Sequence, residues 1–119
     1  MKRLLVLALL IATLATGLSQ TQREMNDDAQ KDFQKADAQL NKVYKQVLAT
    51  ADAESQEKLK VAQRNWIAFR DAEAAFEAAF EADREARGGS IAPLIYSGTH
   101  TALTKGRTAA LKALLEPSE

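Results

Sequence analysis

The strongest constraint on the fold is a regular spacing of mainly apolar residues in the middle of the chain. The residues that carry it are separated alternately by three and four positions, and they are Leu59, Ala62, Trp66, Phe69, Glu73, Phe76 and Phe80. Because an α-helix turns by about 100° per residue, this spacing places them on one side of a helix. The sequence therefore predicts a helix from near Asp52 or Ser55 to about Ala86 that buries this 59–80 stripe.

A second apolar pattern, nearer the N-terminus than the 59–80 stripe, predicts another long helix. Apolar residues again recur every three or four positions, at Met25, Ala29, Phe33, Ala36, Leu40, Val43 and Val47. Thr21, followed three residues later by Glu24, fits a capping box, in which both side chains bind free backbone amides at a helix start. We therefore predict a helix from Thr21 to about Thr50. The connection to the next helix is short, so the two should pack antiparallel as a hairpin.

A glycine pair separates these helices from a third apolar segment. Gly88 and Gly89 favour a chain turn, because they remove the side chain where the backbone must change direction. We interpret residues 91–115 as a third helix; the alternative is a loop as far as Gly98, with a helix only from Thr101. The predicted fold class is therefore all-α, a small antiparallel bundle in which two long helices form a hairpin and a C-terminal helix joins them.

The first residues have the composition of a secretory signal peptide. A short basic segment precedes an apolar run from Leu4 to Leu14, and small residues follow, with cleavage expected after Gly17 or Ser19. The apolar run is shorter than the roughly 20 residues that a membrane span requires. We expect residues 1–19 to be a signal peptide and residues 20–119 to form one helical domain, periplasmic or secreted and not inserted in a membrane. An uncleaved anchor is the alternative.

Charge and residue usage exclude several classes of function. The chain has 16 basic and 16 acidic residues, so it lacks the excess of positive charge that nucleic-acid binding requires. It has no cysteine and a single histidine, His100, so neither a disulfide nor a zinc site of nitrogen and sulfur ligands is expected. No nucleophile is accompanied by a base and an orienting acid, and no nucleotide-binding motif occurs. We therefore predict a protein that is not an enzyme and has no cofactor and no metal.

Glu73 places a carboxylate within the otherwise apolar 59–80 stripe, and a buried carboxylate needs a partner. Arg107 lies on the core face of the predicted third helix and can offer two donors. Arg70 is one turn from Glu73, and Asp37 borders the stripe of the first helix. We therefore hypothesise a structural polar network of Asp37, Arg70, Glu73 and Arg107 that fixes the register of the helices.

Several short motifs, in this order and spacing, resemble the LprI-type lysozyme-inhibitor domain, a family of small exported bacterial proteins. The matching residues are Thr21-Gln22 through Met25-Asn26, Lys35 to Asn41 with Tyr44, Ala62 to Arg64 with Trp66, Phe69 to Glu73, Gly88 to Ser90 with Pro93 and Tyr96, and Leu103-Thr104 with Arg107-Thr108. The resemblance covers essentially the whole mature chain. It implies an all-helical fold, export and a protein partner, with lysozyme as the candidate. Family members commonly carry cysteines where this chain has Asp28, Ala74 and Thr99, so the resemblance implies a version stabilised without disulfides.

Blocking lysozyme would require a segment that enters a cleft lined by two catalytic carboxylates. The region after the glycine pair offers hydrogen-bond donors beside exposed backbone. The candidate partner-binding loop therefore consists of Gly88, Gly89, Ser90, Tyr96 and His100. The alternative function is a periplasmic structural or protein-interaction module without lysozyme inhibition, which docks through any part of the 59–80 stripe that the bundle leaves uncovered.

Overall fold

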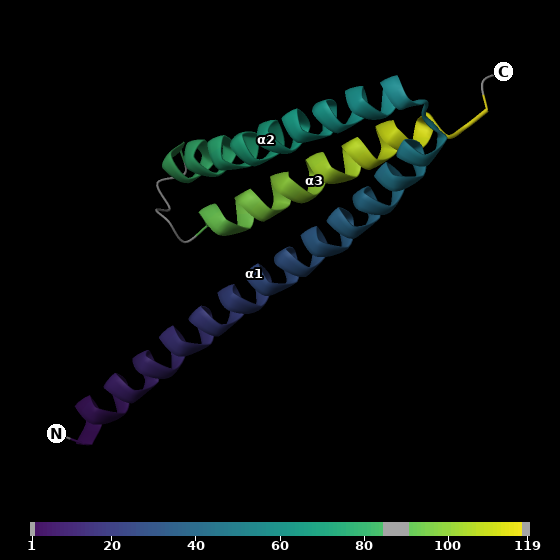
Figure 1. The fold of residues 1–119 in the computed structure, drawn as a ribbon. Helices are drawn as coiled ribbons and strands as arrows, with labels where there is room; N and C mark the ends of the chain where they lie inside the picture. The colour runs from purple at the N-terminus through teal and green to yellow at the C-terminus, as the bar shows by residue number, and fades with distance from the viewer. Residues whose placement is uncertain (1, 85–90, 118–119) are drawn as a thin grey trace.

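The computed structural model describes residues 2–84 and 91–117, with side chains from Thr21 onward. Three helices, α1 (Lys2–Thr50), α2 (Ala53–Arg84) and α3 (Ala92–Ala113), make up the described chain, and no strand occurs within it. The predicted all-α fold of three helices is therefore confirmed (Figure 1). In the same described part, no helix combines the length and the apolarity that crossing a bilayer would require.

The third helix organises the bundle. α3 packs along both α1 and α2, whereas the backbones of α1 and α2 approach each other much less. Figure 1 shows the two long helices diverging from the turn that joins them, with α3 lying between them. The expected hairpin is thus opened along most of its length, and α3 supplies the common contact surface.

The turn between α1 and α2 is fixed by side chains at the start of α2. Asp52 accepts a hydrogen bond from the backbone amide of Ser55 at 2.8 Å, which satisfies a free amide at the helix start. The Gln56 side-chain amide donates to the backbone carbonyls of Leu48, at 2.9 Å, and Ala51, at 3.2 Å. These bonds tie the beginning of α2 to the end of α1 and set the angle at which the two helices leave the turn.

The predicted start of the first helix at Thr21 is wrong, because α1 is already helical at Lys2. The residues before Thr21 are rich in leucine and alanine, which are strong helix formers, so the helix continues through the expected capping box. Side chains from Thr21 to Met25 are exposed, and Asn26 is the first partly covered one. Among the side chains described, from Thr21 onward, contact with the rest of the bundle therefore begins a few residues into that range.

The third helix runs without interruption from Ala92 to Ala113. Pro93 lies in its first turn, where its missing amide hydrogen costs nothing. The helix passes through Gly98, so the alternative of a loop as far as Gly98 is wrong. The predicted end of the second helix near Ala86 lies outside the described residues.

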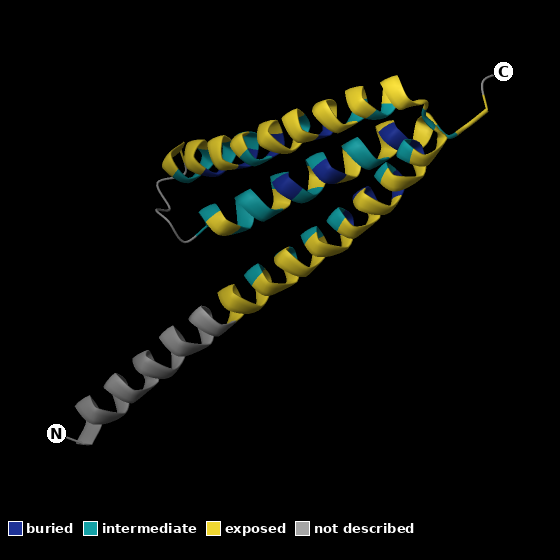
Figure 2. Cartoon of the chain, viewed as in Figure 1, coloured by how far each residue is buried: buried dark blue, intermediate teal, exposed yellow. Residues whose placement is uncertain are grey.

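The hydrophobic core lies towards the end of the bundle where α1 meets α2. Its buried members are Leu40, Val43, Val47 and Leu111, and the half-buried residues packed against them are Tyr44, Leu59, Trp66 and Leu115. Figure 2 shows the buried positions along the facing sides of the helices, with exposed residues on their outer sides. A small apolar core at one end means that the polar contacts farther along must also hold the helices together.

The prediction that the 59–80 stripe is buried is wrong for most of its length, because only Leu59, Trp66 and Glu73 are partly covered and Ala62 is exposed. Phe69, Phe76 and Phe80 are 53%, 58% and 53% exposed. The face of α2 that α3 covers lies beside the stripe, and its buried residues are Gln63, Arg70, Ala74 and Ala78. Alanines at this contact allow α3 to approach closely, whereas phenylalanines would hold it away. A strict seven-residue repeat also drifts by about 20° per repeat around a straight helix, which helps to carry the stripe away from the contact.

Candidate functional site

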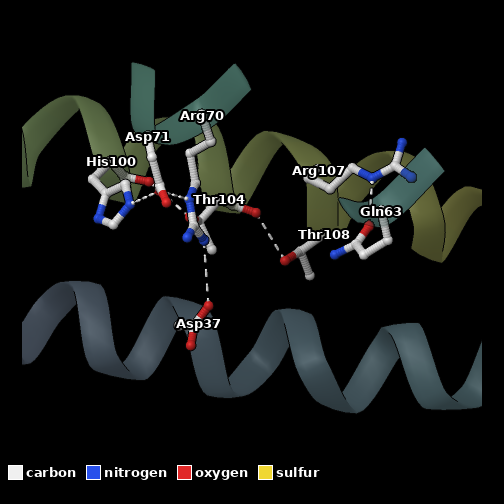
Figure 3. Close-up of polar contacts among 8 residues, drawn as sticks. All are labelled: Asp37, Gln63, Arg70, Asp71, His100, Thr104, Arg107 and Thr108. Atoms are coloured by element: carbon white, nitrogen blue, oxygen red, sulfur yellow. Dashed lines mark hydrogen bonds and ion pairs between the residues drawn. The ribbon is translucent and has the colours of Figure 1, made fainter. Parts of the chain in front are cut away.

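Arg70 lies at the centre of a polar network that joins all three helices (Figure 3). The residue is 6% exposed. Its Nε donates to Asp71 Oδ1 at 2.9 Å, and its Nη1 lies 3.4 Å from both Asp37 Oδ1 on α1 and Thr104 Oγ1 on α3. A guanidinium has five donor hydrogens in a fixed plane, so one side chain can contact several acceptors at once.

Aromatic rings complete the surroundings of the Arg70 guanidinium. Its central carbon lies 5.3 Å from the ring centroid of Phe33 on α1 and 5.3 Å from that of Trp66 on α2. At these distances the negative faces of the rings attract the cation. The charge of Arg70 is therefore held by carboxylates and rings together, which offsets the cost of burying it.

His100 extends the network from α3. Its Nε2 lies 2.6 Å from Asp71 Oδ1, and its ring stacks on Phe33 with centroids 4.0 Å apart. The Tyr96 ring packs against the His100 ring in a tilted arrangement, with the centroids 5.0 Å apart. The imidazole is buried, and its contacts with one carboxylate and two aromatic rings fix its orientation.

The electrostatics of this network act mainly on Asp71. Burial raises the pKa of Asp71, but the hydrogen bonds from His100 and Arg70 and their charges outweigh that effect. The net result is a pKa below the ordinary value, which means that the folded state favours the ionised carboxylate. A carboxylate with a lowered pKa stabilises the fold at pH values above its unfolded pKa, and this contribution is lost as the pH falls.

The network differs from the predicted one at two of its four members. Arg70 and Asp37 do meet, but Arg107 donates from Nε to Gln63 Oε1 at 3.0 Å and lies 5.9 Å from the Trp66 ring. The expected pair of Glu73 and Arg107 is not formed. Glu73 is half-buried, and among the described residues it has no hydrogen bond or ion pair.

Sequence reasoning missed the residues that complete this network, which are Gln63, Asp71, His100 and Thr104. Asp71 follows Arg70 directly, and adjacent residues on a helix do not normally face each other. The two side chains nevertheless meet because the guanidinium Nε reaches the neighbouring carboxylate. The sequence did offer one signal for two of these residues. His100 and Thr104 are four positions apart, which places them on the same face of α3, and that face is turned towards the other helices. The Thr104 hydroxyl donates to the His100 carbonyl at 2.7 Å.

The predicted partner-binding loop is not a single exposed loop. Gly88, Gly89 and Ser90 lie outside the described residues. Tyr96 and His100 belong to α3, and His100 is buried beneath Phe33 and Asp71. His100 is therefore not available to a partner, because its ring already serves the contact between the helices.

The exposed phenylalanines form a second feature of interest, which we call the α2 aromatic face. It comprises Phe69, Phe76 and Phe80, spaced seven and four residues apart, and the rings of Phe76 and Phe80 lie 5.7 Å apart. Along the helix, Glu73 lies between Phe69 and Phe76, and Asp83 follows Phe80 by about one turn. Within residues 2–84 and 91–117, no cluster of three or more histidine, aspartate or glutamate side chains could hold a metal ion.

Comparison with known proteins places the chain in a sequence family. The family model described as lysozyme inhibitor LprI matches residues 15–111. An uncharacterised protein of Rhizobium meliloti is 39% identical over 112 residues, which cover 83% of this chain and 77% of the relative. No solved structure matches. The matched region contains α2, most of α3, and the part of α1 that packs against them.

Proposed function

The chain belongs to the LprI family of lysozyme inhibitors, and we propose on that basis that it is exported and then binds and blocks lysozyme. The observation that carries this proposal is the extent of the family match, residues 15–111, which includes every buried residue of the core. The family is one of inhibitors rather than enzymes, so the expected activity is binding.

The rigidity of the bundle supports a binding role. Arg70 holds the three helices in one arrangement through contacts with Asp37, Asp71 and Thr104. A surface that is already ordered loses little conformational entropy when a partner docks on it. The protein can therefore present a preformed surface, as inhibitors of enzymes commonly do.

The position of the packed region supports export with removal of residues 1–19. All residues of the core and of the Arg70 network lie after Ser19, so cleavage after Gly17 or Ser19 would leave them in the mature chain. Expression of the full chain in a bacterium, followed by cell fractionation and mass measurement, tests this step. We expect periplasmic or secreted protein that lacks the first 17 or 19 residues; full-length protein retained in the cytoplasm would contradict export.

The inhibitory step is tested by a lysis assay. Purified protein in molar excess should slow the clearing of a bacterial cell-wall suspension by lysozyme, in proportion to the amount added. Heat-denatured protein at the same concentration serves as the control. An undiminished rate of lysis at every excess, against several lysozymes, would refute this function.

The second candidate function is a periplasmic structural or protein-interaction module without lysozyme inhibition. It is favoured by the α2 aromatic face, because large exposed apolar side chains grouped on one helix commonly mark a contact surface. Under this function lysozyme activity would be unchanged, and light scattering would give a mass that rises with protein concentration or with an added envelope extract.

A further inference from the structure

We propose that the α2 aromatic face, together with Glu73 and Asp83, is the surface through which this protein binds a basic protein partner. The inference rests on the proposed function, since it assigns the surface that would contact lysozyme. It also replaces the region after the glycine pair as the expected binding surface, because His100 in that region is buried.

The first argument is the placement of the rings. Phe69, Phe76 and Phe80 are each more than half exposed, although each carries an aromatic ring that water solvates poorly. Their spacing is that of a helix-packing stripe, but α3 covers the adjacent face through Ala74 and Ala78. The described part of the chain leaves more than half of each ring exposed, and a docked partner would bury that area. Aromatic residues on a rigid helix are also typical anchors of protein interfaces.

The second argument is charge. Glu73 and Asp83 lie on the same side of α2 as the rings. The lysines at the other end of α2 are matched locally, because Lys58 pairs with Glu54 at 2.7 Å and Lys60 with Glu57 at 2.9 Å.

The basic residues nearest to the rings do not cancel this acidity. Arg70 points into the network, and Arg84 lies 3.4 Å from Glu81, so these two charges offset each other and leave those of Glu73 and Asp83. The C-terminal half of α2 therefore presents aromatic rings among carboxylates. Arginine and lysine side chains of a partner could pair with those carboxylates and also lie against the rings.

The same charges decide between possible occupants. A second copy that docked with its own α2 aromatic face would bring a second set of carboxylates against Glu73 and Asp83, and like charges in contact are unfavourable. A basic protein meets complementary charge instead. Many lysozymes are basic, so a lysozyme has the chemistry that this surface fits.

Contacts between α2 and α3 fix the position of the helix that carries the rings. Glu77 accepts a hydrogen bond from the Thr99 hydroxyl at 2.6 Å, and Arg70, two turns earlier, contacts Thr104. Because the rings themselves make few contacts within the chain, they can be replaced without removing these anchors. This separation makes the proposal testable with folded variants.

The experiment measures binding of a basic animal lysozyme to the purified chain by calorimetry at low and high salt. One variant combines Phe69→Ser, Phe76→Ser and Phe80→Ser, and a second combines Glu73→Lys with Asp83→Lys. The matched controls are Val61→Ser and Leu114→Ser, which remove apolar side chains that are 47% and 68% exposed elsewhere on the surface. Circular dichroism and thermal melting establish that each variant is folded.

We expect the phenylalanine variant to weaken binding by about tenfold or more, because central aromatic residues dominate interface energies. The charge variant should weaken binding and reduce its dependence on salt, whereas the controls should bind within about twofold of the original chain. Binding that is unchanged in the phenylalanine variant would overturn the inference and leave the proposed function standing. If the original chain binds no lysozyme, the proposed function fails and this inference with it. A dimer in light scattering that the phenylalanine variant dissociates would assign the face to a second copy and also overturn the inference.

Discussion

Replacing Arg70 with methionine should test whether the polar network holds the bundle together. Methionine keeps an unbranched apolar side chain of similar length but removes the guanidinium. The lost contacts are two cation–π contacts, each worth about 0.5–1 kcal/mol. Ion pairs to Asp37 and Asp71, whose side chains are 39% and 48% exposed, are lost as well. Because those carboxylates can be solvated, each pair should contribute only about 0.5–1 kcal/mol.

The expected cost of Arg70→Met is therefore about 2–4 kcal/mol in the free energy of unfolding, measured by urea denaturation followed by circular dichroism. For a domain of this size such a loss lowers Tm by about 10–30 °C. Arg64→Met, which removes an exposed arginine from the same helix, should change stability by less than about 0.5 kcal/mol. If Arg70→Met cost no more than Arg64→Met, the network would be incidental to stability and the reasoning about its role would be refuted.

Four further predictions follow from individual contacts. Gly106→Ala should stabilise the chain by about 0.5–1 kcal/mol in urea denaturation, because the added methyl group meets nothing within 4 Å and alanine favours helix; a loss would contradict this. Leu40→Ala, at a side chain 1% exposed, should cost about 2–4 kcal/mol by the same measurement. Glu73→Gln should change stability by less than about 0.5 kcal/mol, and a large loss would reveal a partner for this carboxylate. The original chain should lose stability as the pH falls through and below 3.8, the ordinary pKa of an aspartate, and Asp71→Asn should flatten that part of the profile of Tm against pH.

The helices were predictable because their signals are local. Apolar spacing identified all three, and the glycine pair separated the second from the third. The start of α1 was not predictable from Thr21 and Glu24, since a capping box stops a helix from extending backwards only if the preceding residues disfavour helix. Here those residues are mostly leucine and alanine, and the helix continues through them.

The packing of the helices could not be predicted from the spacing of apolar residues alone. The 59–80 stripe is the most apolar side of α2, but α3 covers the neighbouring side, where Ala74 and Ala78 permit a close approach. Which side is covered depends on the shape of both helices and on partners such as Arg70 and Thr104, which are 34 residues apart in the chain. The structure brings Arg70 and Asp37 together as expected, whereas Arg107 contacts Gln63 and does not pair with Glu73.

The central position of α3 has a consequence for the order in which the chain can fold. The backbones of α1 and α2 approach each other little, and the helix that packs against both follows them in the chain. A nascent chain that ends before residue 92 therefore lacks the surface on which its two long helices assemble. Stable structure should appear only when the C-terminal helix is complete, and a chain exported as proposed would remain unfolded, and fit for translocation, until then.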